Sequence, residues 1–159
     1  MQGTPGSDAA MLAYLARRGT SAQWRGFLRA LVETLDGSLD RAGRDALLRA
    51  VGGRLGATLP LGPADTLASL EARMNEALAG LEWGFVGIGV DEADRSLRLT
   101  HHAMPAVPLP ADESGHWFGA VLEGLYGAWM TAQQGGATGG ATMRVVQSDT
   151  ARLVLRYGS

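Results

Sequence analysis

The spacing of apolar residues changes from a helical period to a strand period near Trp83, and this change limits the folds open to the chain. Before Trp83, apolar residues recur every three or four positions, as on one face of a helix. From there on they alternate, so that Val86, Ile88 and Val90 share one face of a strand. The other face carries Trp83, Phe85, Gly87 and Gly89. Helices followed by short alternating strands predict an α+β fold with an antiparallel sheet.

Three apolar stripes predict three helices in the first half, and we expect each stripe to pack into the core. The first stripe is Trp24, Phe27, Leu28, Leu31 and Leu35; the second helix starts near Asp40 and carries Leu47, Leu48, Val51 and Leu55; the third carries Leu67, Leu70, Met74, Leu78 and Leu81. Asp65 or Thr66 can cap the third helix. Gly52, Gly53 and Gly56 are expected to weaken the end of the second.

The second half predicts two hairpins around a fourth helix. Leu97, Leu99 and His101 alternate in a returning strand, which makes 83–103 a hairpin. A helix from about His116 to Gln133 follows, and two strands in 141–157 complete the chain. The expected order is three N-terminal helices, a β-hairpin, a long helix and a β-hairpin, with the helices packed on a small antiparallel sheet. Residues 1–20 are read as a flexible N-terminal arm before a single domain, 21–159.

Composition excludes several classes of function. The net charge is −2 and no basic block is present, which argues against nucleic-acid binding. The chain has no cysteine, so disulfides and thiolate chemistry are excluded. No run of about 18 apolar residues predicts a membrane-spanning helix. The first 20 residues do not read as a secretory signal, and we expect a cytoplasmic protein.

Candidate catalytic groups are few. His101 and His102 are neighbours on a strand and point to opposite faces, so they do not share a metal. A metal site at His116 with Asp112 or Glu113 is conceivable, although surface or capping histidines are commoner. The stretch GFVGIG lies within a strand and is not followed by a helix, which argues against phosphate binding. We therefore predict no catalytic, cofactor-binding or metal-binding residue, and no enzyme activity.

The fourth helix has a second face made of small residues, where a solvent-facing helix normally carries charge. Its apolar stripe is Phe118, Val121, Leu122, Leu125 and Trp129, extended by Tyr126 and Met130; the small face is Ala120, Gly124, Gly127, Ala128 and Thr131. Two glycines within a helix cost about 1 kcal/mol each relative to alanine. We expect close contact with a second element or a second copy of the chain to offset this cost. The alternative is a frayed surface helix.

The segment VLEGLYGAWMTAQ, from Val121 to Gln133, resembles the signature helix of the bacterial cellulose synthase operon protein D family. Further matches are collinear: Leu47-Leu48-Arg49 with Val51-Gly52, then Trp83-Gly84, then Leu97-Arg98 leading to His101 and Pro105. The positions taken as the family motif are Trp83, Gly84, His101, Pro105, Leu122, Glu123, Gly124, Leu125, Tyr126, Gly127 and Trp129. The resemblance covers about 24–157. It departs from the family at Ala128, where the family pattern has arginine.

The resemblance implies a non-catalytic accessory subunit that forms a ring-like homo-octamer from dimers. Such a subunit would guide or organise nascent β-1,4-glucan chains for export and crystallisation, beside the synthase complex and other operon proteins. Glucan-binding residues are unknown; Tyr14 and Trp24 are weak candidates for stacking on sugar rings, and core packing is the stronger expectation for Trp24. We expect the cytoplasmic side of the inner-membrane synthase complex, with the periplasm as the alternative.

Two other functions stay open at this point. A small-molecule or haem-sensing domain would use His101 as its axial ligand. A small enzyme is the weaker alternative, because Glu123 is the only acid in the signature helix and has no obvious partner acid.

Overall fold

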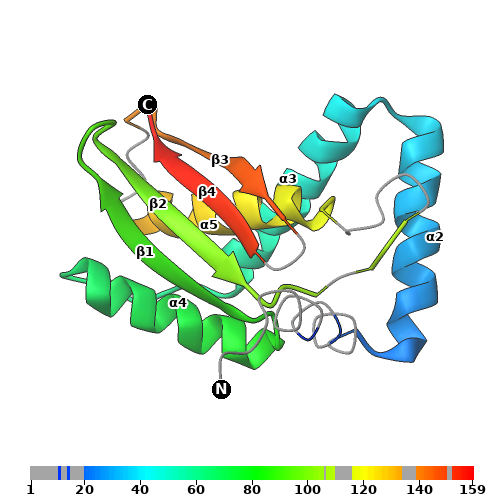
Figure 1. Cartoon of the computed structure of the whole chain (residues 1–159), viewed down its shortest axis with the longest axis horizontal. Coiled ribbons are helices and arrows are strands. Elements are labelled where there is room, and N and C mark those ends of the chain that lie inside the picture. Colours follow the sequence, from blue (N-terminus) through cyan, green and yellow to red (C-terminus); the bar gives the residue numbers. More distant parts are fainter. Residues whose placement is uncertain are drawn as a thin grey trace, which may run out of the picture.

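The computed structural model describes residues 11, 14, 20–105, 107–109, 116–133, 139–149 and 152–159 (Figure 1). Its helices are α2 (Ala22–Ser38), α3 (Arg41–Thr58), α4 (Leu67–Leu81) and α5 (Phe118–Gln133). Its strands are β1 (Phe85–Asp91), β2 (Ser96–His102), β3 (Thr142–Ser148) and β4 (Arg152–Gly158). The predicted α+β class and order of elements are confirmed within these residues. Most of the N-terminal arm lies outside them.

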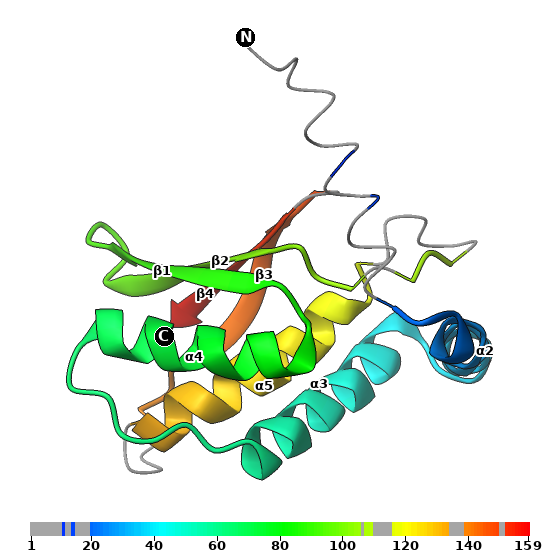
Figure 2. The same ribbon diagram turned by 90° about the horizontal axis from the view of Figure 1, so that it is seen from below.

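The described strands form one antiparallel sheet in the order β1-β2-β4-β3. The two hairpins are joined at its centre, where β2 pairs with β4. Figure 2 shows the sheet edge-on, with α4 and α5 together beneath one face. Helix α5 contacts β3 and β4 on one side and α3 on the other. The long helix therefore lies between the sheet and α3.

The core is built from the sheet face that meets α4 and α5. On β2 and β4 alternate residues point inward, and Leu99, His101 and Leu155 are fully buried. Helix α5 contributes Leu122 and Leu125, also with no exposed surface. The predicted stripe of α4 largely holds: Leu70, Met74 and Leu78 are buried, while Leu67 is more than a third exposed.

Two of the helix starts follow the sequence prediction. Asp40 caps α3 by accepting a hydrogen bond from the backbone N–H of Gly43 at 2.8 Å. Thr66 caps α4 in a capping box: its hydroxyl accepts from the N–H of Ser69, and the hydroxyl of Ser69 accepts from the N–H of Thr66. Of the two predicted caps, Thr66 is therefore the one that forms. These side chains satisfy backbone donors that no helical carbonyl can reach.

Side chains from the helices cover both edges of the sheet. Asn75 of α4 donates to the carbonyl of Val86 and accepts from its N–H, both at 2.8 Å, and Glu71 accepts from the N–H of Ile88 at 2.6 Å. At the opposite edge, Glu123 of α5 accepts from the N–H of Val145 at 2.7 Å. Open strand edges template pairing with other chains, and these contacts block part of each edge.

The position of Trp83 corrects the expected strand pattern. Gly84 has φ +78°, and a Cβ there would lie 2.0 Å from the carbonyl oxygen of His102. This left-handed residue breaks the alternation, so β1 begins at Phe85. Trp83 packs against the core, edge-on to Phe118 at 4.7 Å between ring centroids, and does not share the exposed face of Phe85.

Helix α2 lies at the side of the molecule beside α3 (Figures 1 and 2), and it reaches the core through Val32, which is 1% exposed. Its stripe was expected in the core, and for most of its length this is wrong. Trp24 is 55% exposed, Phe27 56% and Leu31 42%. Leu28 and Leu35 are half-buried. The helix leaves the layer of α4 and α5, so its apolar side is not covered by the sheet.

Candidate functional site

Helices α3 and α5 cross at a contact made by their glycines. A Cβ added to Gly52 would lie 1.9 Å from the carbonyl oxygen of Val121, and one added to Gly124 would lie 1.9 Å from that of Arg49. One turn further along, a Cβ at Gly56 would be 2.7 Å from the Cβ of Ala128. Real Cβ atoms do not approach so closely. The two backbones therefore touch, and only glycine fits at Gly52 and Gly124.

This contact rotates α3 away from the expected orientation, so that only Leu48 and the half-buried Leu55 of its predicted stripe face the core. Leu48 is buried as predicted, but Leu47 is 42% exposed and Val51 43% exposed, because the glycine side of the helix faces α5. The glycines were expected to weaken the end of the helix, yet α3 continues to Thr58. The signal that could have revealed this was the match in spacing: Gly52 and Gly56 are four residues apart, as are Gly124 and Ala128.

The small face of α5 is occupied by elements of the same chain. Ala120 is buried, Gly124 and Ala128 meet α3, and a Cβ at Gly127 would be 3.7 Å from the Cβ of Met143 in β3. Thr131 is half-buried at the end of this face. Of the two expected partners, the structure shows a second element for the Gly124 side. A role of these five residues between copies of the chain stays a prediction.

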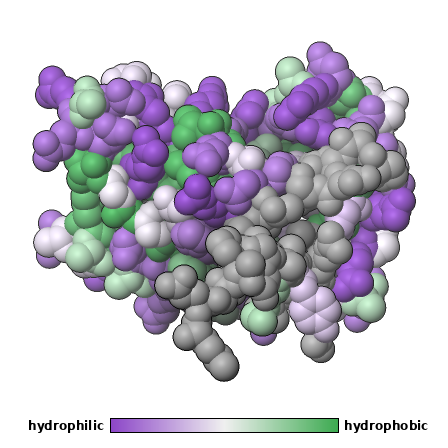
Figure 3. All heavy atoms as spheres, in the orientation of Figure 1, coloured by the Kyte–Doolittle hydropathy of each residue, from purple (hydrophilic) through white to green (hydrophobic). Residues whose placement is uncertain are grey.

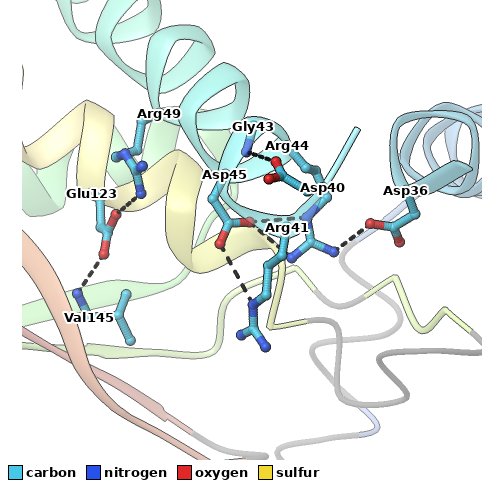
Figure 4. A network of polar contacts seen from close by, with 9 residues as sticks. All are labelled: Asp36, Asp40, Arg41, Gly43, Arg44, Asp45, Arg49, Glu123 and Val145. Carbon is cyan, nitrogen blue, oxygen red and sulfur yellow. Dashed lines mark hydrogen bonds and ion pairs between the residues drawn. The ribbon is translucent and has the colours of Figure 1, made fainter. Parts of the chain in front are cut away.

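Glu123 joins α5 to both of its neighbours (Figure 4). Its Oε2 lies 2.9 Å from a guanidinium nitrogen of Arg49 in α3, while its Oε1 accepts from the N–H of Val145 in β3. The side chain is only 9% exposed. A buried carboxylate needs compensating partners, and both oxygens have one. The acid of the signature helix thus locks three elements together.

A second polar cluster lies beside Glu123 at the junction of α2 and α3 (Figure 4). Arg44, which is 8% exposed, bonds Asp36 of α2 at 2.8 Å and Asp45 at 2.9 Å. A hollow of about 680 Å³ opens here, reaching from the start of α3 to His116 and β3. The bond between Arg44 and Asp36 links α2 to the body of the molecule.

A shallower groove of about 650 Å³ runs between α3, α5 and β3. Small residues form much of its floor, among them Gly53, Ala57, Gly127 and Ala132. The groove lies beside the contact between α3 and α5. Residues on the small face of α5 that border it, such as Gly127 and Thr131, are therefore half-buried.

His101 lies at the centre of the core and points toward Tyr126, whose hydroxyl is within hydrogen-bond distance of Nδ1. Burial lowers the pKa of His101 to about 4 and raises the pKa of Tyr126 well above its usual value. Both groups are therefore neutral near pH 7, and the hydroxyl and Nδ1 share a buried hydrogen bond. Neither hollow described above is lined by His101, so its position does not favour a haem ligand.

Acid should destabilise the protein through His101. A histidine in the unfolded chain has a pKa of about 6.5, so between that value and about 4 the unfolded state binds a proton that the folded state excludes. The free energy of unfolding should fall by about 3 kcal/mol as the pH drops across this window, and stay level above it. Urea unfolding between pH 7 and 4.5 should show that the free energy of unfolding of His101→Gln falls less steeply with decreasing pH than that of the wild type. The control His102→Gln changes the neighbour on the opposite face; equal slopes in the two variants would contradict the assignment.

The remaining motif residues serve packing. Leu122 and Leu125 are fully buried, and the indole N–H of Trp129 donates to the carbonyl of Leu59 at 2.8 Å, which ties α5 to the end of α3. Pro105 is half-buried in the segment after β2. The motif residues of α5 thus reflect how this helix meets its neighbours.

The conceivable metal site is not formed by the described residues. His116 lies 3.2 Å, through Nε2, from the backbone carbonyl of Asp149, while Asp112 and Glu113 lie outside the described residues. Among the residues that are described, no three His, Asp or Glu side chains gather closely enough to hold a metal ion. Within the same part of the chain, none of the helices combines the length and the apolar character that crossing a membrane requires.

Tyr14 and Trp24, the weak candidates for sugar stacking, are both exposed, at 58% and 55%. Trp24 packs edge-on against Phe27, with ring centroids 5.7 Å apart. Their role toward glucan stays a prediction.

The fold and site define a small α+β protein whose buried Glu123, Arg44 and His101 hold its elements together. The family model described as the D-type subunit of cellulose synthase matches residues 10–158. The chain is 38% identical over 109 residues to a cellulose synthase operon protein D of Komagataeibacter xylinus, covering 69% of this chain and 70% of that protein. It is 35% identical over 112 residues to the protein of the same name from Komagataeibacter sucrofermentans, with the same coverage.

The chain belongs to the cellulose synthase operon protein D family. This membership confirms the resemblance carried by the signature helix. It supports a role in bacterial cellulose synthesis and an association with other proteins of the cellulose synthase operon.

Proposed function

We propose that this chain is a non-catalytic accessory subunit that assembles with copies of itself beside the cellulose synthase and organises nascent β-1,4-glucan for export and crystallisation. The assembled form is a homo-octamer built from dimers. It works on the cytoplasmic side of the inner-membrane synthase complex; the periplasm is the alternative compartment.

The exposed apolar stripe of α2 carries this proposal. Trp24, Phe27 and Leu31 lie on one side of α2, and each is more than 40% exposed, although Val32 of the same helix is buried in the core. A lone apolar side chain on a surface is ordinary, but a continuous stripe with two large aromatics indicates an interaction surface. A second copy supplies an identical stripe, which allows a symmetric contact.

The polar groups also support a role without catalysis. Glu123 has both carboxylate oxygens occupied, and His101 is buried and neutral. An acid–base catalyst needs a free group within reach of a substrate. His101 lines neither hollow, and Glu123, which borders both, already has both oxygens engaged by Arg49 and Val145. In this proposal residues 1–20 form an arm ahead of the domain and contact glucan or a partner.

Removal of the protein from the producing cell tests the proposal. Sugar-nucleotide incorporation by isolated membranes should stay near the wild-type level, because the synthase itself makes the bonds. Cellulose yield in living cells and crystalline order in fibre diffraction should fall, because chains emerge without alignment. A chain lacking residues 1–20 should give a milder defect.

The two readouts separate an organiser from other roles. An equal loss of incorporation in isolated membranes would indicate a required catalytic or regulatory subunit. Unchanged fibres in the deletion strain would remove the organising role.

A further inference from the structure

The sheet has an outer face, opposite α4 and α5, that no described helix covers (Figure 2). Its β4 part is not open, because Val154, the partner of Thr100, is 4% exposed, so the exposed part of this face lies along β1 and β2. The strand register assigns its residues: Phe85, Gly87, Gly89 and Asp91 of β1 lie opposite His102, Thr100, Arg98 and Ser96 of β2. Figure 3 views the molecule from this side and shows apolar residues at the surface over the β1 and β2 region, between hydrophilic ones.

One end of this strip is an aromatic platform. Phe85 is 54% exposed, and its ring stacks on that of His102 with centroids 5.0 Å apart and planes 19° from parallel. The two residues are direct partners across β1 and β2, which fixes how the rings lie. The stack leaves a large part of the phenyl ring in solvent, although Phe85 belongs to the strand and not to a loop.

The next two outward positions are glycines that this chain does not require. A Cβ at Gly87 would meet no atom within 4 Å, and one at Gly89 would meet only the carbonyl oxygen of Arg98, at 3.9 Å. No neighbouring backbone therefore requires glycine at these two positions. Glycine within a strand costs about 0.5–1 kcal/mol relative to alanine. The open surface over Gly87 and Gly89, the glycine floor, is therefore suited to close contact with a bound ligand.

The polar residues around this floor balance their charges. Arg98 pairs with Asp91 at 3.2 Å, and Arg156, its neighbour on β4, pairs with Asp94 at 3.4 Å. Thr100 lies opposite Gly87 and adds a hydroxyl. An anionic ligand would compete with the aspartates for these guanidinium groups. A neutral ligand rich in hydroxyls can bond to both members of each pair.

We propose that Phe85, Gly87 and Gly89, with His102, Thr100 and Arg98 beside them, form a binding strip for one flat face of a β-1,4-glucan chain. A pyranose ring has an apolar C–H face that stacks on an aromatic ring, and equatorial hydroxyls at its edges. In the extended β-1,4 chain these edges run along both sides of a ribbon. The phenyl ring receives one sugar, the glycine floor admits the next, and the paired arginine and aspartate bond to hydroxyls. The choice of glucan rests on the proposed function.

Titration of the full chain with cellohexaose, followed by amide NMR, tests the strip. Shifts should concentrate at Gly87, Gly89 and Thr100. Phe85→Ala should weaken binding about five- to tenfold, the effect of losing one aromatic contact. Gly87→Val fills the floor with a good strand former and should abolish the shifts while the protein stays folded. The matched control is Val146→Ala on β3, since Val146 is as exposed as Phe85 at 54% and lies outside the strip, so the affinity for this short sugar should be unchanged.

Maltohexaose, with the same sugar units in a curved α-1,4 chain, should bind at least about fivefold more weakly, because its rings cannot lie along a straight strip. Equal binding of the two sugars, equal losses in Phe85→Ala and Val146→Ala, or an absence of shifts on β1 and β2 would each overturn the strip. None of those results would decide the proposed function, which is tested separately by the fibres of the deletion strain. Conversely, cellohexaose binding with normal fibres in the deletion strain would sustain the strip and remove the organising role.

Discussion

Gly52→Ala should lower the free energy of unfolding by about 3 kcal/mol, which corresponds to a fall in melting temperature of roughly 10 °C. The added Cβ would lie 1.9 Å from the carbonyl oxygen of Val121 and 2.8 Å from the amide nitrogen of Leu125. Both are backbone atoms within α5, so relief requires α3 and α5 to move apart along their whole contact. Thermal and urea unfolding of the purified variant measure the change.

The neighbouring glycine is the matched control. Gly53 lies in the same helix turn, but a Cβ there would meet nothing within 4 Å. Gly53→Ala should therefore raise stability by up to about 1 kcal/mol, from helix propensity alone. Gly124→Ala should behave as Gly52→Ala does. If Gly52→Ala and Gly53→Ala had the same effect, the backbone contact between the helices would be refuted.

The double variant Trp24→Gln/Phe27→Gln should convert the assembled protein to a single chain of 16.6 kDa. Both side chains are more than half exposed on α2, and their burial between copies would supply much of the apolar contact. Glutamine is a good helix former, so α2 should persist. Light scattering gives the mass, and circular dichroism checks that the helix content is unchanged.

Phe85→Gln is the control for this variant, because Phe85 is equally exposed but lies on the sheet. It should keep the wild-type mass. Loss of assembly in both variants would indicate a general effect of removing surface aromatics, and an unchanged mass in the α2 variant would exclude this stripe as the contact.

Period and spacing were enough to predict the layout of the chain. The alternation after Trp83 located both strands of the first hairpin, and it placed His101 and His102 on opposite faces. The two-sided pattern of α5 also held, because a helix between a sheet and another helix must bury both sides. In these elements the apolar or small character of each side chain was enough to predict whether it is buried.

The sequence did not predict which side of α3 faces inward, or that α2 leaves the core. Leu47 and Val51 read as a core stripe, yet the close approach of Gly52 to α5 turns them outward. Hydrophobicity alone misses a contact that depends on the absence of side chains. The stripe of Trp24 and Phe27 was predicted to pack into the core, but both side chains are more than half exposed in the described part of the chain.

The side chains that cover the sheet edges were also invisible in the sequence. Asn75 and Glu71 look like ordinary polar residues of an amphipathic helix, and only the fold brings them to the free edge of β1. Glu123 was noted as a lone acid, and its two partners come from α3 and β3, far from it in sequence. Long-range contacts of this kind require the three-dimensional arrangement.

The mass of the full chain in solution tests the central claim, self-assembly, most directly. Light scattering at micromolar concentration should give a stable species far above 16.6 kDa, at the mass of an octamer or of the dimers that build it. A stable monomer under these conditions would contradict the account, since α2 would then expose its aromatic stripe to solvent with no second copy to cover it.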